Sequence, residues 1–390
     1  MLDGLWLVLL LLPLAAASGW YLRGRFRPAE ENPPVVHADY LRGISHLVNE
    51  DADKAIEVFM RLLEVDNETV ETHLALGNLF RRQGEVDRAL RVHQNLVARP
   101  NLKAIHRNQA RFELAQDYLR AGVLDRAEDL FRELVDQGMF LERALVGLLS
   151  IYEAERDWRQ AIETTRRLES ARGQALRPVI AQYHCEMAEA ARESGDADAA
   201  LNHLGRARHE YRDCVRASLL RGEIAEAADD HTAAIKAYRQ VVRQDIDFVT
   251  EIIEPLRRCH DVLGQPDGYR KLLEQIIPRY LGAAPSIAMA RLMQREGDSD
   301  GAIAFLADYL QGEPSWMGFY HLLDLTSTDS RSGLSGPLES LRQSLQQIME
   351  QQPRYHCGHC GFSGRYLHWQ CPSCKLWNSM APVRDLRPAV

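Results

Sequence analysis

Four cysteines near the end of the chain have the spacing of a metal site. They form two Cys-x-x-Cys hooks, Cys357 with Cys360 and Cys371 with Cys374, separated by ten residues. Each hook turns its two sulfurs toward one point, and the short gap lets the hooks face each other, which is what tetrahedral thiolate coordination needs. We therefore predict that these four cysteines bind one metal ion, zinc or iron. The spacing indicates a metal site and names no reaction.

Other uses of these residues are less favoured. His356, His359 and His368 lie close enough in the sequence to be ligands, but four thiolates already fill a tetrahedral site. A redox-active Cys-x-x-Cys usually belongs to a thioredoxin-like fold, for which this sequence has no pattern. The sequence also lacks the motifs GxxxxGK[ST], HExxH and GxSxG of phosphate-binding loops, zinc proteases and serine hydrolases. We therefore predict no catalytic residue and a protein that is not an enzyme.

The segment that carries the hooks, residues 354–390, is too short to fold by apolar burial alone. We expect Phe362, Leu367 and Trp369 to form a small core, and the metal to supply most of the folding free energy, on the order of 10 kcal/mol for structural zinc. The hooks resemble those of rubredoxin and zinc ribbons. Rubredoxin usually has glycine directly after its second hook, where this chain has Lys375, and a longer gap between its hooks. This departure favours a structural metal over an electron-transfer iron.

The remaining cysteines and the charge distribution limit the compartment and the class of partner. Cys185, Cys214 and Cys259 stand singly in helical stretches, which favours small buried side chains and a reducing compartment over a disulfide framework. The net charge is −8, yet residues 23–27 and 354–390 are basic, so the body between them is strongly acidic. An acidic body repels nucleic acid, whose binding depends on phosphate neutralisation. No nucleic-acid partner is therefore expected.

The middle of the chain repeats a helical hairpin. A small residue recurs at the same place in successive units, and five of the seven spacings are 34 residues. The positions are Ala55, Ala89, Ala127, Ala161, Ala200, Ala234, Gly268 and Ala302. A period of 34 is that of the tetratricopeptide family, which the chain resembles over residues 37–325, in about eight to nine units. Stacked helix pairs of this kind form a superhelix whose concave face binds other polypeptides.

Turn residues between the helices support this interpretation. We expect Gly84 and Gly195 to end first helices in a left-handed cap, and an aspartate of the same turns, which end at Asp87 and Asp198, to begin the second helices as an N-cap. The small residue lets the two helices of a hairpin approach closely. Gly268 replaces alanine in one unit, and we expect that unit to be the most distorted.

The N-terminal segment has the pattern of a membrane-spanning helix. Residues 5–22 contain no charged side chain, and as a helix rising about 1.5 Å per residue they reach roughly 27 Å, enough to cross a bilayer core. A cleaved signal peptide would need positive charge before the apolar run, whereas three arginines follow it within residues 23–27. The arginine side of such a helix stays in the cytoplasm. We therefore predict an uncleaved, single-pass anchor with the body facing the cytoplasm.

Together these features predict a fold class and five segments. The fold class is all-α: a tetratricopeptide-repeat superhelix with an N-terminal transmembrane helix and a small C-terminal rubredoxin-like or zinc-ribbon knuckle. Before the knuckle, Pro337 begins a predicted amphipathic helix, which either docks on the end of the array as a cap or binds a partner. The segments are a transmembrane anchor at 1–22, a juxtamembrane tether at 23–36, the repeat array at 37–325, a linker and amphipathic helix at 326–353, and a rubredoxin-type metal-binding domain at 354–390.

This order of parts resembles the lipopolysaccharide assembly protein B family of Gram-negative bacteria over essentially the full length. The stretch from Tyr355 to Cys374, with Cys-Gly-x-Cys-Gly-Phe and Trp-x-Cys-Pro-x-Cys, agrees with that family. The resemblance implies an inner-membrane adaptor that regulates lipopolysaccharide biosynthesis. It implies as partners the membrane-anchored protease FtsH, the lipid A pathway deacetylase LpxC, whose degradation the adaptor promotes, and other lipopolysaccharide assembly proteins of the inner membrane. It also implies that the knuckle is needed for function and packs against the repeats.

Two other functions fit the same parts. One is a membrane-tethered scaffold for another envelope assembly, and the other is a rubredoxin-like redox module. The adaptor is favoured because an anchor that confines the array to the membrane raises its effective concentration near a membrane-bound protease. The sequence leaves open the native metal, the face of the array that binds each partner, the formation of a homodimer and direct binding of lipopolysaccharide.

Overall fold

The computed structural model describes residues 70–328 and 336–384, together with residues 18, 43, 45 and 46. The predicted membrane-spanning segment at 5–22, apart from Ser18, and the tether at 23–36 lie outside these residues. Among the residues described, no helix is both long enough and apolar enough to cross a membrane. The chain divides into two compact units, Met1–Leu130 and Phe131–Val390.

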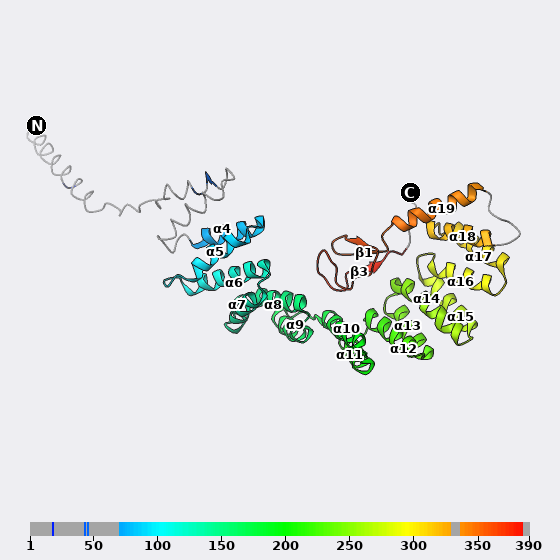
Figure 1. The fold of residues 1–390 in the computed structure, drawn as a ribbon, viewed down its shortest axis with the longest axis horizontal. Coiled ribbons are helices and arrows are strands. Elements are labelled where there is room, and N and C mark those ends of the chain that lie inside the picture. The colour runs from blue at the N-terminus through cyan, green and yellow to red at the C-terminus, as the bar shows by residue number, and fades with distance from the viewer. Residues whose placement is uncertain (1–17, 19–42, 44, 47–69, 329–335, 385–390) are drawn as a thin grey trace, which may run out of the picture. The chain divides into compact units, whose positions relative to one another are not determined.

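The described part of the first unit consists of consecutive helices, and the first three pack against one another (Figure 1). The helices are α4 (Val70–Gln83), α5 (Val86–Val97), α6 (Ala104–Ala121) and α7 (Leu124–Asp136), whose last residues belong to the second unit. A charged network joins the first three of these helices. Asp117 of α6 accepts a hydrogen bond from Arg81 of α4 at 2.7 Å, and its second oxygen lies 2.5 Å from Nδ1 of His93 in α5. Such partners are what permits these polar side chains to be buried.

The second unit continues the array as helix hairpins (Figure 1). Its helices are α8 (Leu141–Glu155), α9 (Trp158–Arg172), α10 (Arg177–Glu193), α11 (Ala197–Glu210), α12 (Val215–Ala227), α13 (His231–Gln244), the 3₁₀ helix η2 (Ile246–Phe248), α14 (Val249–Val262), α15 (Pro266–Ile276), the 3₁₀ helix η3 (Ile277–Arg279), α16 (Ala284–Arg295), α17 (Ser299–Gly312) and α18 (Trp316–Thr328). Each even-numbered helix from α8 to α16 packs against the odd-numbered helix that follows it. The mostly helical repeat fold predicted from the sequence is therefore confirmed.

The repeated small residue lies where two helices meet. Every alanine that the structure describes at this position is fully buried, with an exposed fraction of 0%: Ala89, Ala127, Ala161, Ala200, Ala234 and Ala302. The predicted glycine caps are present, but Asp87 lies within the first turn of α5, whose N-cap is Glu85 without a side-chain hydrogen bond. Gly84 and Gly195 have φ of 85° and 84°. Four second helices begin with an aspartate whose side chain accepts a backbone N–H of the first turn: Asp157, Asp196, Asp230 and Asp298.

The unit with Gly268 departs from this pattern. Helix α15 has 11 residues, the fewest of any α-helix that the structure describes, and it continues into the 3₁₀ helix η3. Gly268 is exposed, and a Cβ atom added to it would lie 2.9 Å from Cε1 of His260. The imidazole of His260 is buried in this unit, so glycine fits here where alanine would be crowded.

The chain then leaves the array through one more helix. Helix α19 (Gly336–Gln351) packs on α18. Leu345 is buried in this contact, whereas Leu338, Leu341 and Ile348 are between 41% and 48% exposed. The predicted amphipathic helix therefore docks at the end of the array, and much of its apolar face remains exposed.

The last described segment, residues 354–384, forms the knuckle. Its three strands are β1 (Tyr355–Cys357), β2 (Ser363–Gly364) and β3 (Met380–Pro382), and they form a sheet in the order β2-β1-β3. Both pairings are antiparallel, with Tyr355 opposite Gly364 and Cys357 opposite Met380. The sheet fixes the start of the first hook, because Cys357 is the last residue of β1.

Candidate metal centre and the adjoining inner face

The two hooks bring four sulfur atoms to one point. The Sγ atoms of Cys357, Cys360, Cys371 and Cys374 all lie within 4.8 Å of one another, and the three nearby histidines do not belong to this group among the residues described. The sulfur of Cys357 is 3.8 Å from that of Cys374, and the sulfur of Cys360 is 3.7 Å from that of Cys371. With zinc–sulfur bonds of about 2.3 Å, the sulfurs of a regular tetrahedron are about 3.8 Å apart. The geometry therefore fits one tetrahedral ion, and four sulfurs suit zinc and iron alike.

Both hooks use the same backbone turn. In the first hook the N–H of Gly361 donates to the carbonyl of Cys357 at 3.0 Å, and in the second the N–H of Lys375 donates to the carbonyl of Cys371 at 2.9 Å. Gly361 and Lys375 thus hold equivalent positions, with φ of 76° and 59°. Glycine adopts this left-handed conformation freely, whereas a residue with a Cβ atom pays roughly 1–2 kcal/mol. Lys375 therefore occupies a position where glycine is the unstrained residue.

The first cysteine of each hook is buried in a small core. Cys357 and Cys371 are 2% and 0% exposed, and they pack with Met380. Phe362 and Leu367 pack against this cluster, as expected from the sequence. The sulfur cluster and the apolar residues therefore share one centre.

The expectation that Trp369 belongs to this small core is wrong. Its ring instead stacks on Phe248 of the array, with centroids 5.6 Å apart and planes 10° from parallel. The guanidinium of Arg216 also lies over the Trp369 ring, 5.8 Å from its centroid. The knuckle is too small to bury an indole, whereas the array offers both an aromatic face and a cation.

Trp377 makes a second aromatic contact between the knuckle and the array. Its ring meets Tyr183 edge-on at 5.7 Å, and Tyr183 stacks on Trp158 at the same distance. The carboxylate of Glu153 accepts three hydrogen bonds here, from Trp377 Nε1 at 2.8 Å, Gln370 Nε2 at 3.0 Å and the Tyr183 hydroxyl at 2.6 Å. Glu153 therefore joins the second hook to helices α8 and α10.

Polar contacts tie the two ends of the knuckle to the array around α14. The hydroxyl of Tyr355 donates to Glu251 at 2.9 Å, and Arg384 donates to both oxygens of Asp247 at 2.6 and 2.8 Å. The Tyr280 hydroxyl donates to the backbone carbonyl of Arg384 at 3.3 Å. Burial raises the pKa of Glu251 and, together with the charge of Glu251, that of Tyr355. The carboxylate of Asp247 raises the pKa of Arg384.

These array contacts come mainly from the first helices of successive hairpins, α8, α10, α12 and α14, and we call the surface that these helices form the inner face. None of its residues lies in a sequence motif that marks it as functional. The contacts join positions 104 to 224 residues apart, so no local spacing could reveal them. The only available signal was a knuckle with more aromatic residues than its small core can bury.

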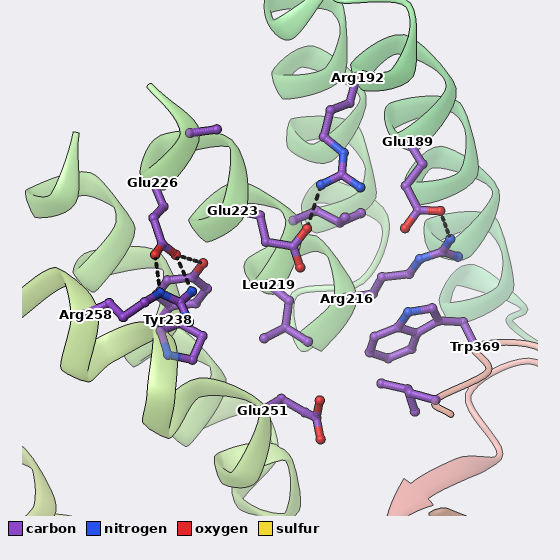
Figure 2. A pocket seen from close by; sticks show the side chains of 14 residues that line it. Glu189, Arg192, Arg216, Leu219, Glu223, Glu226, Tyr238, Glu251, Arg258 and Trp369 are labelled. Carbon is purple, nitrogen blue, oxygen red and sulfur yellow. Dashed lines mark hydrogen bonds and ion pairs between the residues drawn. The ribbon is translucent and has the colours of Figure 1, made fainter. Parts of the chain in front are cut away.

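A cavity of about 710 Å³ lies on the inner face beside Trp369 (Figure 2). Trp369 and Leu367 of the knuckle form one wall. Its three arginines are each paired with a glutamate of the inner face, as Arg192–Glu223 at 2.7 Å, Arg216–Glu189 at 2.7 Å and Arg258–Glu226 at 2.8 Å. Each charge in this cavity has a partner even when the cavity is empty, so a ligand needs no charge of its own. Ion pairs around apolar side chains therefore suit the binding of a polypeptide segment.

The three single cysteines are buried, as predicted. Cys185 and Cys259 are 0% exposed and Cys214 is 2% exposed. Burial raises the pKa of the Cys185 thiol, and it raises that of Cys259 to about 11. Because the thiolate is the reactive form, Cys185 and Cys259 act as small apolar side chains.

Family models and relatives match both the array and the knuckle. Tetratricopeptide repeat models match residues 72–105 and 185–247, and a rubredoxin metal binding domain model matches residues 355–382. Lipopolysaccharide assembly protein B of Escherichia coli (strain K12) is 35% identical over 385 residues, which cover 97% of this chain and 98% of that protein. The protein of the same name from Haemophilus influenzae is 33% identical over 391 residues, with the same coverage.

Proposed function

Because this chain belongs to the lipopolysaccharide assembly protein B family, we propose that it is a non-enzymatic adaptor that regulates lipopolysaccharide biosynthesis. The observation that carries the proposal is the match to named relatives over 97% of the chain. The repeat fold supports protein partners, since stacked helical hairpins present an extended surface for polypeptides. The cavity with paired charges on the inner face offers a site for a segment of a partner polypeptide.

The adaptor acts by proximity at the bacterial inner membrane, with its body in the cytoplasm. Residues 5–22 anchor it in the plane of the membrane, where the protease FtsH is also anchored. Confinement of two partners raises their effective concentration without any new contact between them. The array then presents the deacetylase LpxC to the protease, and the supply of lipid A precursor falls as LpxC is degraded.

The four cysteines of the two hooks hold one metal ion, zinc or iron, and its role is structural. The sulfur–sulfur distances of 3.7 and 3.8 Å support this assignment. The ion supplies the folding free energy that so short a segment lacks. Residues of the two hooks then keep Trp369 and Trp377 against the inner face, and in this way the metal site shapes the surface that partners meet.

The cellular half-life of LpxC tests the function. It should lengthen several-fold when this protein is depleted and return to its normal value when the protein is resupplied from a plasmid. A half-life that does not change on depletion would exclude the adaptor role in LpxC degradation and leave a scaffold for another envelope assembly.

A further inference from the structure

A second cavity, of about 650 Å³, shares Leu367 and Trp369 with the first. It is bounded by the end of α8, the start of α9 and the second hook of the knuckle. Three tryptophans line it, Trp158, Trp369 and Trp377. Indole rings offer large apolar contact at low conformational cost and are typical of protein-binding surfaces.

Cations that line this cavity lack partners of their own. Arg156 and Lys375 both line it and are exposed, and within the described part of the chain neither side chain makes a hydrogen bond or an ion pair. The two carboxylates in the cavity are already engaged, since Glu153 accepts hydrogen bonds from Trp377 and Gln370, and Glu186 pairs with Arg216 at 2.8 Å. In the neighbouring cavity of Figure 2, by contrast, each arginine has a glutamate. Among the residues that the structure describes, Arg156 and Lys375 are therefore cations of this lining without an acidic partner.

Arg156 and Lys375 both have a backbone conformation that is unfavourable for residues with a side chain. Their φ angles are 58° and 59°, in the region where glycine is the residue without strain. Arg156 is the C-cap of α8, a position that commonly carries glycine, and Lys375 stands where the first hook has Gly361. Both strained positions therefore carry a long, positively charged side chain, and both residues line the same cavity. Strain that is retained at one place is a reason to look for function there.

We propose that this cavity, which we call the cation pocket, binds an acidic segment of a partner polypeptide. A carboxylate of that segment pairs with Arg156 and Lys375, and a neighbouring apolar side chain packs between Trp158 and Trp369. A single carboxylate is favoured over a phosphate group because Glu153 and Glu186 in the lining repel a compact double charge more strongly. The inner face of a repeat array is also a surface that takes extended polypeptides. The identity of the partner rests on the adaptor function proposed above, whereas the chemistry of the site does not.

Peptide binding to the full-length protein in detergent tests this proposal. The probes are a fluorescein-labelled ten-residue peptide of alternating leucine and glutamate, and the same peptide with glutamine for glutamate. Fluorescence anisotropy should show at least tenfold tighter binding of the acidic peptide, and its affinity should fall as salt is raised. Equal binding of the two peptides would overturn the proposal.

Glycine substitutions at Arg156 and Lys375 test the role of the two cations without straining the backbone. The double variant Arg156→Gly and Lys375→Gly removes both cations and places glycine where it is unstrained, so its thermal midpoint should equal or exceed that of the wild type. It should bind the acidic peptide at least tenfold more weakly. Arg239→Gln removes an exposed cation of α13 outside both cavities and should change the affinity by less than twofold. A folded double variant that binds as tightly as the wild type would overturn the proposal.

Competition separates the classes of anion. Inorganic phosphate at millimolar concentration and vesicles containing anionic phospholipid should fail to displace the acidic peptide at constant ionic strength. Displacement by either, lost in the double variant, would assign the pocket to a phosphate group and overturn the polypeptide proposal.

The half-life of LpxC separates this inference from the proposed function. If depletion of the protein lengthens the half-life and the folded double variant restores it fully, the adaptor function stands and the pocket is not its partner site. If depletion has no effect while the acidic peptide binds as described, the pocket stands and the adaptor function falls. A double variant that binds peptide weakly and fails to restore the half-life supports both.

Discussion

Cys371 is fully buried, and its sulfur lies 3.7 Å from that of Cys360. Serine lacks the soft thiolate that zinc and iron prefer, and three sulfurs hold an ion less tightly than four. We expect Cys371→Ser to lose its metal to a chelator that leaves the wild type loaded, measured as metal per chain after gel filtration. Cys259→Ser alters a buried thiol of the array and should retain one ion per chain. Full retention by Cys371→Ser would remove this residue from the ligand set.

Glu251, which accepts a hydrogen bond from Tyr355 of the knuckle, should make the stability of the folded protein depend on pH. Burial raises its pKa above the ordinary value of about 4.5, so the folded protein holds this proton to a higher pH than the unfolded chain does. The stability that the proton contributes is complete below about pH 4.5 and is lost as pH rises through the folded-state pKa.

The variant Glu251→Gln tests whether ionisation of Glu251 lowers the stability as pH rises. Glutamine does not ionise, and its carbonyl oxygen still accepts the hydrogen bond of Tyr355. We expect the variant to have a higher thermal midpoint than the wild type at pH 7, and the difference to vanish near pH 4. Midpoints that coincide at both pH values would mean that Glu251 titrates in the folded state as it does in the unfolded chain.

At the scale of elements, Glu153 decides how firmly the second hook rests on α8 and α10. Glu153→Ala removes the acceptor of two hydrogen bonds from the knuckle and leaves the Trp377 N–H without its partner. Hydrogen bonds to a charged group contribute roughly 1.5–3 kcal/mol each, so docking should weaken by about 3 kcal/mol. Hydrogen exchange of the knuckle amides should accelerate accordingly. Glu163→Ala, on the exposed side of α9, is the control, and equal exchange in both variants would show that Glu153 does not hold the knuckle.

Which elements form could be predicted from local patterns, because their causes are local. The recurring alanine is fully buried wherever it is described, and the glycine and aspartate caps lie where the turns required them. The hook spacing likewise predicted the sulfur cluster. How the elements dock could not be predicted. Trp369 was assigned to the wrong core, since an aromatic residue beside a hook looks the same whether its partner is nearby or the distant Phe248.

The cation pocket likewise could not be predicted from the sequence. Lys375 stood out in the sequence as a departure from the glycine that rubredoxin has after its second hook. Only the backbone angles show that Arg156, 219 positions earlier in the chain, is the same kind of exception. Their common cavity depends on the docking of the knuckle, which no pattern in either segment encodes.

At the scale of the whole molecule, the proposed metal site and the proposed partner surface depend on each other. In the proposed arrangement the hooks hold the ion, while Trp369 lines both cavities of the inner face and Trp377 lines the cation pocket. Loss of the ion should therefore change partner binding although no partner touches it. This coupling gives a structural metal a functional consequence without any reaction at the metal.

The proposed action by proximity makes a prediction about the N-terminal segment. A chain without residues 1–22 should fold with an unchanged thermal midpoint, because the described array and knuckle make their contacts without that segment. In cells it should leave the half-life of LpxC as long as in depleted cells, since effective concentration at the membrane is lost. Replacement of residues 1–22 by an unrelated single-pass segment of the same orientation should restore the normal half-life. A truncated chain that restores it would exclude proximity, and a folded, membrane-bound replacement that does not would show that the native segment itself contacts a partner.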